Sequence, residues 1–328
     1  MRAWEKFKKS IVDNNLITIN SAVLVAVSGG PDSVCLLHMF WRLTKTLPFK
    51  LYVATFDHAL RKNSAGEVAF VQKLCSRLEV KCVSEKLEVL KYSKKHKLSL
   101  ETAGRQMRYT ALEKYAKLFK CDKIATAHNA NDNAETLLMW LIRGTGLDGL
   151  AGIPIRRTFS NMELIRPLIS VERNEILSYL KNQKLKYRID PSNKSIEFTR
   201  NKIRKAIIPV FESINPLFVE HVFKLSRIVE AQNTVLNSMA QSARERCLKV
   251  AKNGRIFLDL RRFLEYNKLL KLRIIKDLLS YGRTSNNIEK THRWLCSCEN
   301  GTLVLNKSTQ IIKKTNQAVF VFKKNEKI

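Results

Sequence analysis

The sequence predicts an α/β fold with a doubly wound parallel sheet, followed by a mainly helical domain with a small β-rich end. Three observations support this fold class. In the first half of the chain, short apolar runs rich in β-branched residues alternate with segments of helical periodicity. The links between them are short, as in right-handed crossovers with helices on both faces of a sheet. From about residue 216 onward, long helical segments dominate.

The strands of the sheet are predicted from apolar runs. Residues 22–27 read Ala-Val-Leu-Val-Ala-Val, a continuous run of the kind that lies buried inside a parallel sheet. Three further segments that alternate with the helices are predicted as strands, at residues 50–56, 81–87 and 122–127. Segments with helical periodicity are predicted as helices, at residues 3–14, 34–43, 67–78, 101–119, 133–143 and 171–183.

The alternation weakens after Pro154. We expect an extended piece that begins at Arg166 and a basic helix over residues 200–211 that is stopped by Pro209. Later helices are predicted at residues 216–247, about 259–279 and 286–298, and short strands at 302–305, 310–312 and 318–322. The domain boundary is placed before Pro216, which gives a catalytic domain of residues 1–215 and a basic, helical domain of residues 216–328.

The composition points to a polyanionic partner. The chain of 328 residues has 59 Lys and Arg against 29 Asp and Glu, a formal net charge of +30, and the excess is densest in the last third. Such a field attracts nucleic acid, although a general preference for Lys is an alternative source of the charge.

Features of secretion or membrane insertion are not apparent. The first residues have no apolar core before a cleavage site, and the apolar runs are too short to span a bilayer. The seven cysteines form no disulfide framework and no C-x-x-C pair. We therefore expect a cytoplasmic protein with no membrane partner.

The loop between the first predicted strand and its helix is the main chemical feature. It consists of Ser28, Gly29, Gly30, Pro31, Asp32 and Ser33. Two glycines allow backbone N–H groups to approach a ligand, and the start of a helix favours phosphate. The serine hydroxyls add donors, and Asp32 is a candidate ligand for Mg²⁺. A glycine-rich turn that binds nothing is the alternative.

Polar residues follow two other strands of the predicted sheet. Asp57 and His58 end the second strand, and His128 ends the fourth. Ligands of open α/β sheets bind beyond the carboxyl ends of the strands, so these residues are candidates for binding the same nucleotide. Each histidine taken alone could equally be a loop or core residue.

The loop resembles the S-G-G-x-D-S motif of the PP-loop, or N-type ATP pyrophosphatase, superfamily. It is neither a Walker A motif nor G-x-G-x-x-G. The resemblance implies an adenine nucleotide alpha hydrolase-like fold, ATP and Mg²⁺ as cofactors, and cleavage of ATP between its α and β phosphates.

Motifs further along resemble those of tRNA(Ile)-lysidine synthetases. They are E-T-A-G-R-Q-M-R-Y at 101–109, H-N-A-N-D-N-A-E-T at 128–136, R-G-T-G-L-D-G-L-A-G at 143–152, R-P-L at 166–168, D-P-S-N at 190–193 and T-R-N-K-I-R at 199–204. The second of these departs from the family pattern, because Asn129, Asn131 and Asn133 stand where the family has His, Asp and Gln.

The resemblance implies that the enzyme adenylates the C2 carbonyl oxygen of the wobble cytidine in a CAU-anticodon tRNA(Ile). Free L-lysine then displaces AMP and leaves lysidine. Arg105 would stabilise the pentavalent phosphorus, and Asp132 and Glu135 would orient the lysine amine and take up its proton. For the acidic pair, ordinary charge at a helix N-terminus is the alternative.

The same resemblance suggests how RNA is bound. Arg200, Asn201 and Arg204 would contact the tRNA, together with the basic helical domain, and a homodimer is compatible with the sequence. One rival is another PP-loop tRNA-modifying enzyme, such as a 2-thiolating enzyme, although these generally carry reactive cysteines, often as C-x-x-C. A glutamine-dependent synthetase would need an amidotransferase domain or partner. A non-catalytic RNA-binding factor is disfavoured by the intact Asp32.

Overall fold

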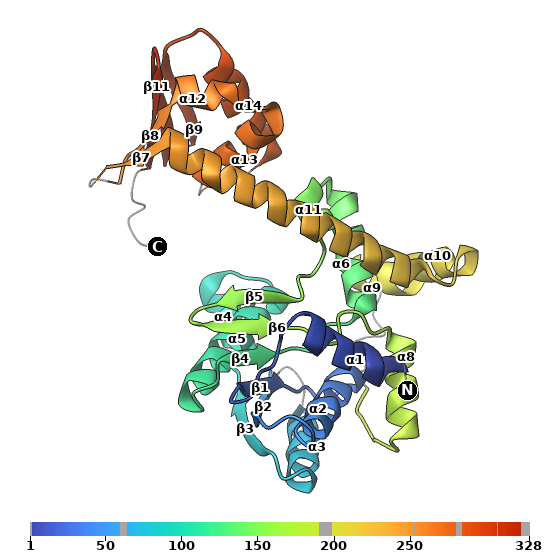
Figure 1. Ribbon diagram of the computed structural model, residues 1–328. Helices are drawn as coiled ribbons and strands as arrows, with labels where there is room; N and C mark the ends of the chain where they lie inside the picture. The colour runs from blue at the N-terminus through green and yellow to red at the C-terminus, as the bar shows by residue number, and fades with distance from the viewer. Residues whose placement is uncertain are drawn as a thin grey trace. The chain divides into compact units, whose positions relative to one another are not determined.

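The computed structural model describes residues 2–59, 64–189, 199–251, 254–279, 284–306 and 308–322. The chain divides into two compact units, Met1–Glu230 and Ala231–Ile328, and the division lies within helix α11, Phe218–Cys247 (Figure 1). The boundary predicted from the sequence, between residues 215 and 216, falls just before this helix and stays a prediction.

A six-stranded sheet forms the centre of the first unit, in the order β3-β2-β1-β4-β6-β5. The strands are β1 Ala22–Ala26, β2 Lys50–Asp57, β3 Lys81–Lys86, β4 Lys123–Ala125, β5 Arg156–Phe159 and β6 Met162–Ile165. All neighbouring pairs are parallel except β5 and β6, which are antiparallel. The predicted parallel sheet is confirmed.

Helices cover both faces of this sheet. The helices of this unit before α11 are α1 Arg2–Asp13, α2 Pro31–Leu43, α3 Ser64–Arg77, α4 Val89–His96, α5 Leu100–Leu118, α6 Ala130–Arg143, α7 Leu147–Leu150, α8 Arg173–Asn182, α9 Thr199–Lys202 and α10 Ile208–Ile214. Successive residues of a strand face opposite sides. Val23 and Val25 accordingly lie in a core cluster with α1, α2, α3 and α8, whereas Ala22 and Leu24 lie in a second cluster with α5. The doubly wound arrangement is therefore confirmed.

Two details near the site differ from expectation. The extended piece expected from Arg166 is wrong, because strand β6 ends at Ile165 and a turn follows. The expected stop at Pro209 is also wrong, because helical structure runs from Thr199 to Ile214 through a π-helical segment, η2, Ile203–Ile207. The N–H of Ile208 donates to Ile203 O in this wider turn, and Pro209 then lies at the start of α10, where its missing N–H is tolerated.

The second unit combines helices with a five-stranded antiparallel sheet, in the order β7-β8-β11-β10-β9. Its elements are β7 Leu248–Val250, β8 Ile256–Asp259, α12 Leu260–Glu265, α13 Lys268–Leu278, α14 Ser285–Cys296, β9 Gly301–Asn306, β10 Thr309–Lys314 and β11 Gln317–Phe322. The helix expected over residues 259–279 is divided, because Asn267 caps a new helix by accepting from Leu270 N–H.

Within the described ranges, no single helix has the length and apolar character needed to cross a membrane. One bent pair, Thr199–Ile214 with Phe218–Cys247, meets that test only when its two helices are taken together.

Candidate active site

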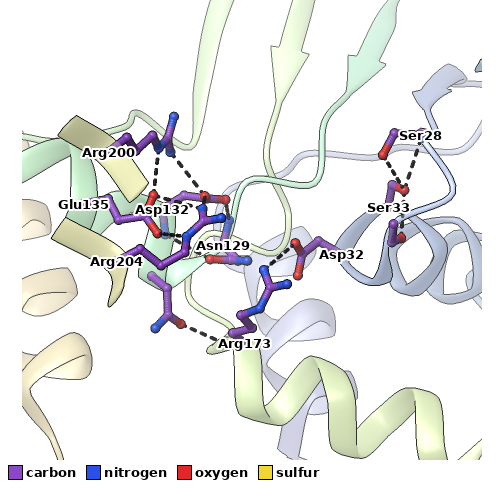
Figure 2. A network of polar contacts seen from close by, with 11 residues as sticks. Ser28, Asp32, Ser33, Asn129, Asp132, Glu135, Arg173, Arg200 and Arg204 are labelled. Carbon is purple, nitrogen blue, oxygen red and sulfur yellow. Dashed lines mark hydrogen bonds and ion pairs between the residues drawn. The ribbon is translucent and has the colours of Figure 1, made fainter. Parts of the chain in front are cut away.

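The predicted phosphate loop joins β1 to α2, and its backbone requires glycine. Gly29 has a φ of +82°, and a Cβ there would lie 3.5 Å from side-chain atoms of Phe70 and Val71. Ser33 Oγ accepts from Ser28 N–H at 3.2 Å and donates to Gly30 O at 3.0 Å, which folds the loop over the start of the helix (Figure 2). No side chain caps α2 at Gly30, so the first amides of this helix can bind a phosphate.

Asp32 lies in the first turn of α2, and its two carboxylate oxygens differ. Oδ2 accepts from Arg173 Nη1 at 3.2 Å, whereas Oδ1 is buried without a hydrogen-bond partner. Burial raises the pKa of Asp32, Arg173 lowers it and Asp132 raises it, with a net rise. An unpartnered carboxylate oxygen beside a phosphate loop fits Mg²⁺, which typically binds through one or two carboxylates plus substrate phosphates.

The three asparagines that depart from the family pattern have defined structural partners. Asn129 Oδ1 accepts from Asp132 N–H, and Asp132 Oδ2 accepts from Asn129 N–H, which forms a capping box at the start of α6. Asn131 Oδ1 accepts from Arg173 N–H and links α6 to α8. Asn133 is fully buried, accepts from Ile153 N–H and donates to Ser226 Oγ. The three asparagines therefore hold the first turn of α6 in place through their hydrogen bonds.

The predicted acidic pair and two of the predicted RNA-binding residues form one network. Glu135 is fully buried and accepts from Arg200 Nε at 2.7 Å and from Arg204 Nε at 2.5 Å. Asp132 Oδ1 accepts from the same two arginines at 3.2 and 3.4 Å (Figure 2). Burial alone would lower the arginine pKa values, but the two carboxylates raise the pKa of Arg200 and of Arg204. Both arginines are therefore charged near neutral pH.

A cavity of about 140 Å³ lies beside this network. Its lining residues are Asn129, Asn131, Asp132, Glu135, Arg173, Asn174, Arg204, Ile208 and Glu212. Arg173 reaches both this cavity and Asp32, so the phosphate loop and the cavity are adjacent. The cavity thus presents both carboxylates and arginines to a small ligand.

Sequence reasoning missed Arg173 and Glu212. Nothing in the local pattern marks Arg173, because its partner Asp32 is distant in the chain. A weak signal existed for Glu212, the one acidic residue in the basic stretch 199–214. Burial raises the pKa of Glu212, and the nearby Glu172 raises it further.

The polar residues at the ends of β2 and β4 lie at the same edge of the sheet as the loop. Strand β1 lies between these two strands and is parallel to both, so all three end at that edge. Asp57 Oδ1 accepts from Ala59 N–H at 2.8 Å. Burial lowers the pKa of His58, with a further contribution from Arg108. His128 Nδ1 is 3.0 Å from Thr126 Oγ1, and burial, with Arg166 next, holds its pKa well below the usual value. Both imidazoles are therefore neutral near pH 7.

Two further predicted residues, Arg105 and Asn201, are not among the residues that line the cavity. Arg105 projects from α5, with its guanidinium carbon 5.2 Å from the centre of the Tyr109 ring. Asn201 lies in α9 beside Arg200. The D-P-S-N motif at 190–193 lies outside the described residues.

Comparisons with known proteins agree with the predicted fold. A PP-loop domain matches residues 2–211. The structure is similar to the U34-tRNA thiolase NcsA from Methanococcus maripaludis with a TM-score of 0.60 at 19% identity, covering 70% of this chain and 78% of that one. At that identity the likeness shows the shared fold.

Relatives found by sequence identify the family more narrowly than this structural likeness does. The tRNA(Ile)-lysidine synthase of Thermosipho africanus is 43% identical over 69% of this chain, and the match spans only 54% of that relative. The tRNA(Ile)-lysidine synthase of Petrotoga mobilis is 32% identical over 95% of this chain and 96% of the relative. The chain therefore belongs to the tRNA(Ile)-lysidine synthase family of PP-loop proteins, as its motifs predict.

Proposed function

We propose that this chain ligates lysine to C2 of the wobble cytidine of a CAU-anticodon tRNA(Ile), with release of AMP and pyrophosphate. One observation carries the proposal. Arg173 pairs with Asp32 of the phosphate loop and also lines the cavity that contains Asp132 and Glu135. A site that activates a carbonyl with ATP is thus directly adjacent to a site that can hold an amine.

In the first step, the C2 carbonyl oxygen attacks the α-phosphorus of ATP and pyrophosphate leaves. The open amides at the start of α2, with Ser28 and Ser33, would bind the departing phosphates. Arg105 would stabilise negative charge that develops at phosphorus. Asp32 would hold Mg²⁺, which neutralises phosphate charge when bound.

In the second step, the lysine amine attacks C2 and AMP leaves. Asp132 and Glu212 both line the cavity and can bind the ammonium form of lysine. Arg173 and Arg204, which line the same cavity, can bind the lysine carboxylate. Because the pKa of Glu212 is raised, this carboxylate is suited to accept the proton that the amine must lose. Asp132 and Glu135 would also orient the amine through their fixed network.

The net charge of +30 supports RNA as the polymer substrate. Arg200 and Arg204 are paired with Asp132 and Glu135, so much of their charge is compensated before RNA arrives. We propose that they bind tRNA next to the acidic pair, and that the unpaired basic residues supply most of the salt-dependent affinity.

A 2-thiolating activity is less well supported. The similarity to a thiolase extends to the fold, whereas the sequence relatives are lysidine synthases. The cavity carries carboxylates that suit an amine, and the sequence has no C-x-x-C pair.

The test is incubation with ATP, labelled lysine and an unmodified CAU-anticodon tRNA(Ile) transcript. We expect one labelled lysine per tRNA, with AMP and pyrophosphate in equal amounts, and no incorporation when the wobble cytidine is replaced by uridine. Absence of lysine incorporation, with AMP formed only when a sulfur donor is supplied, would refute the proposal.

A further inference from the structure

Four arginines gather around one tyrosine at the carboxyl edge of the sheet. The guanidinium carbons of Arg105, Arg108 and Arg157 lie 5.2, 5.8 and 5.5 Å from the centre of the Tyr109 ring. The fourth, Arg166, follows directly after β6 and donates from Nη1 to Pro154 O at 2.6 Å. We refer to Arg105, Arg108, Arg157 and Arg166 as the arginine cluster.

The arginine cluster lacks acidic partners. Within the described part of the chain, no carboxylate forms an ion pair with any of its four members, unlike Arg200 and Arg204. Arg156, next to Arg157 in β5, lies 3.9 Å from a Glu163 oxygen. Four positive charges are thus held close together without local compensation, which favours binding of an anion.

Two polar groups in the cluster are buried without a well-formed hydrogen bond. Arg166 and Tyr109 are 3% and 8% exposed, and they interact with each other, but neither Arg166 Nε nor Tyr109 Oη makes a hydrogen bond of ordinary geometry. Burial, together with the charges of Arg157 and Arg105, lowers the pKa of Arg166 to about 10, although Tyr109 partly raises it. Buried donors without well-formed hydrogen bonds destabilise a fold. A bound anion would offset the repulsion among the arginines.

The position of the cluster indicates which phosphate it binds. Strand β5 is three strands from β1, through β4 and β6. With neighbouring strands about 4.8 Å apart, Arg157 lies about 14 Å across the sheet from the phosphate loop. The phosphates of ATP on that loop would be out of reach of Arg157. His128, at the end of the intervening strand β4, lies between the two regions.

We propose that the arginine cluster binds a backbone phosphate of the RNA through Arg157, next to the nucleotide that is adenylated, whereas Arg105 serves the adenylation step proposed above. Arg157, whose side chain is exposed, supplies the direct phosphate contact, and buried Arg166 adds a positive charge in the same cluster. The inference rests on the proposed function, because RNA is taken as the substrate. Phosphate oxygens are common to RNA and ATP, and the distance across the sheet favours the RNA.

The test compares two neighbouring substitutions, Arg157→Gln and Arg156→Gln. Successive residues of β5 face opposite sides of the sheet, so Arg156→Gln removes the same charge outside the cluster. Both side chains are exposed, so both variants should fold. Binding of the unmodified CAU-anticodon transcript is measured without ATP, over a range of salt concentrations. Affinity for ATP is measured separately by calorimetry.

We expect Arg157→Gln to weaken tRNA binding about tenfold and to reduce the slope of log affinity against log salt by about one. Arg157→Lys should restore part of the affinity, and Arg156→Gln should match the unchanged chain. ATP affinity should be the same in all variants. Unchanged tRNA affinity and slope in Arg157→Gln would overturn the inference, as would a loss confined to ATP binding. Lysine incorporation by the unchanged chain separates the two proposals, because its absence overturns the proposed function itself.

Discussion

The network around Glu135 leads to a quantitative prediction for Glu135→Ala. Three hydrogen bonds join this buried carboxylate to two arginines: Arg200 Nε at 2.7 Å, Arg204 Nε at 2.5 Å and Arg204 Nη2 at 3.0 Å. They anchor the helical stretch Thr199–Ile214 to α6. Among the residues that the structure describes, removal of Glu135 leaves the two guanidinium groups with Asp132 as their one carboxylate partner.

The size of the effect follows from burial. Hydrogen bonds to charged groups contribute about 1.5–3 kcal/mol each, and loss of one partner of a buried ion pair costs about 3–5 kcal/mol. The arginine side chains are 33% and 30% exposed, so water can solvate part of their charge. We therefore expect Glu135→Ala to lower the free energy of unfolding by about 3 kcal/mol.

The assay is urea denaturation of the first unit, followed by tryptophan fluorescence. Trp294→Phe removes the one tryptophan of the second unit, so that Trp4, Trp41 and Trp140 report. With an m-value of about 3 kcal/mol/M, the midpoint should fall by about 1 M. The control is Glu5→Ala, which breaks an exposed pair with Lys8 and should change stability by less than about 0.5 kcal/mol. An unchanged midpoint in Glu135→Ala would refute the anchoring role of the carboxylate.

Three further predictions concern the chemistry. Asp32→Asn should reduce AMP formation at least about 100-fold. An unchanged rate of AMP formation, measured by chromatography, would remove Asp32 from the mechanism. Asp32→Asn should also raise the thermal midpoint of the ligand-free protein at pH 7. Burial raises the pKa of Asp32, so its ionisation weakens the fold as pH rises. The pKa of His128 is held well below its usual value, so ATP affinity measured by calorimetry should show no step near pH 6.5. A step that His128→Gln abolishes would contradict this. Glu212→Gln should raise the KM for lysine several-fold. Pyrophosphate release that depends on tRNA, measured without lysine, should stay unchanged. An unaltered KM for lysine would exclude Glu212 from lysine binding.

The local pattern of the sequence was sufficient for the parallel sheet and its phosphate loop. Buried parallel strands are continuous apolar runs, so residues 22–27 and 50–56 could be recognised without knowledge of their neighbours. The glycines of the loop were also recognisable from local sequence. The φ of +82° at Gly29 is a requirement of the backbone at that residue and does not depend on distant segments. Short strands such as β5 and β7 were not predicted, because three or four residues acquire strand structure only from their partners.

Only the tertiary structure decided how the charged residues are paired. Arg200 and Arg204 were predicted as RNA contacts, yet they lie against Asp132 and Glu135. The sequence by itself determined which charged residues exist and which helices carry them. The pairing depended on distances in space between segments far apart in the chain, because electrostatic energy falls with separation and rises with burial, and neither quantity can be read from sequence order.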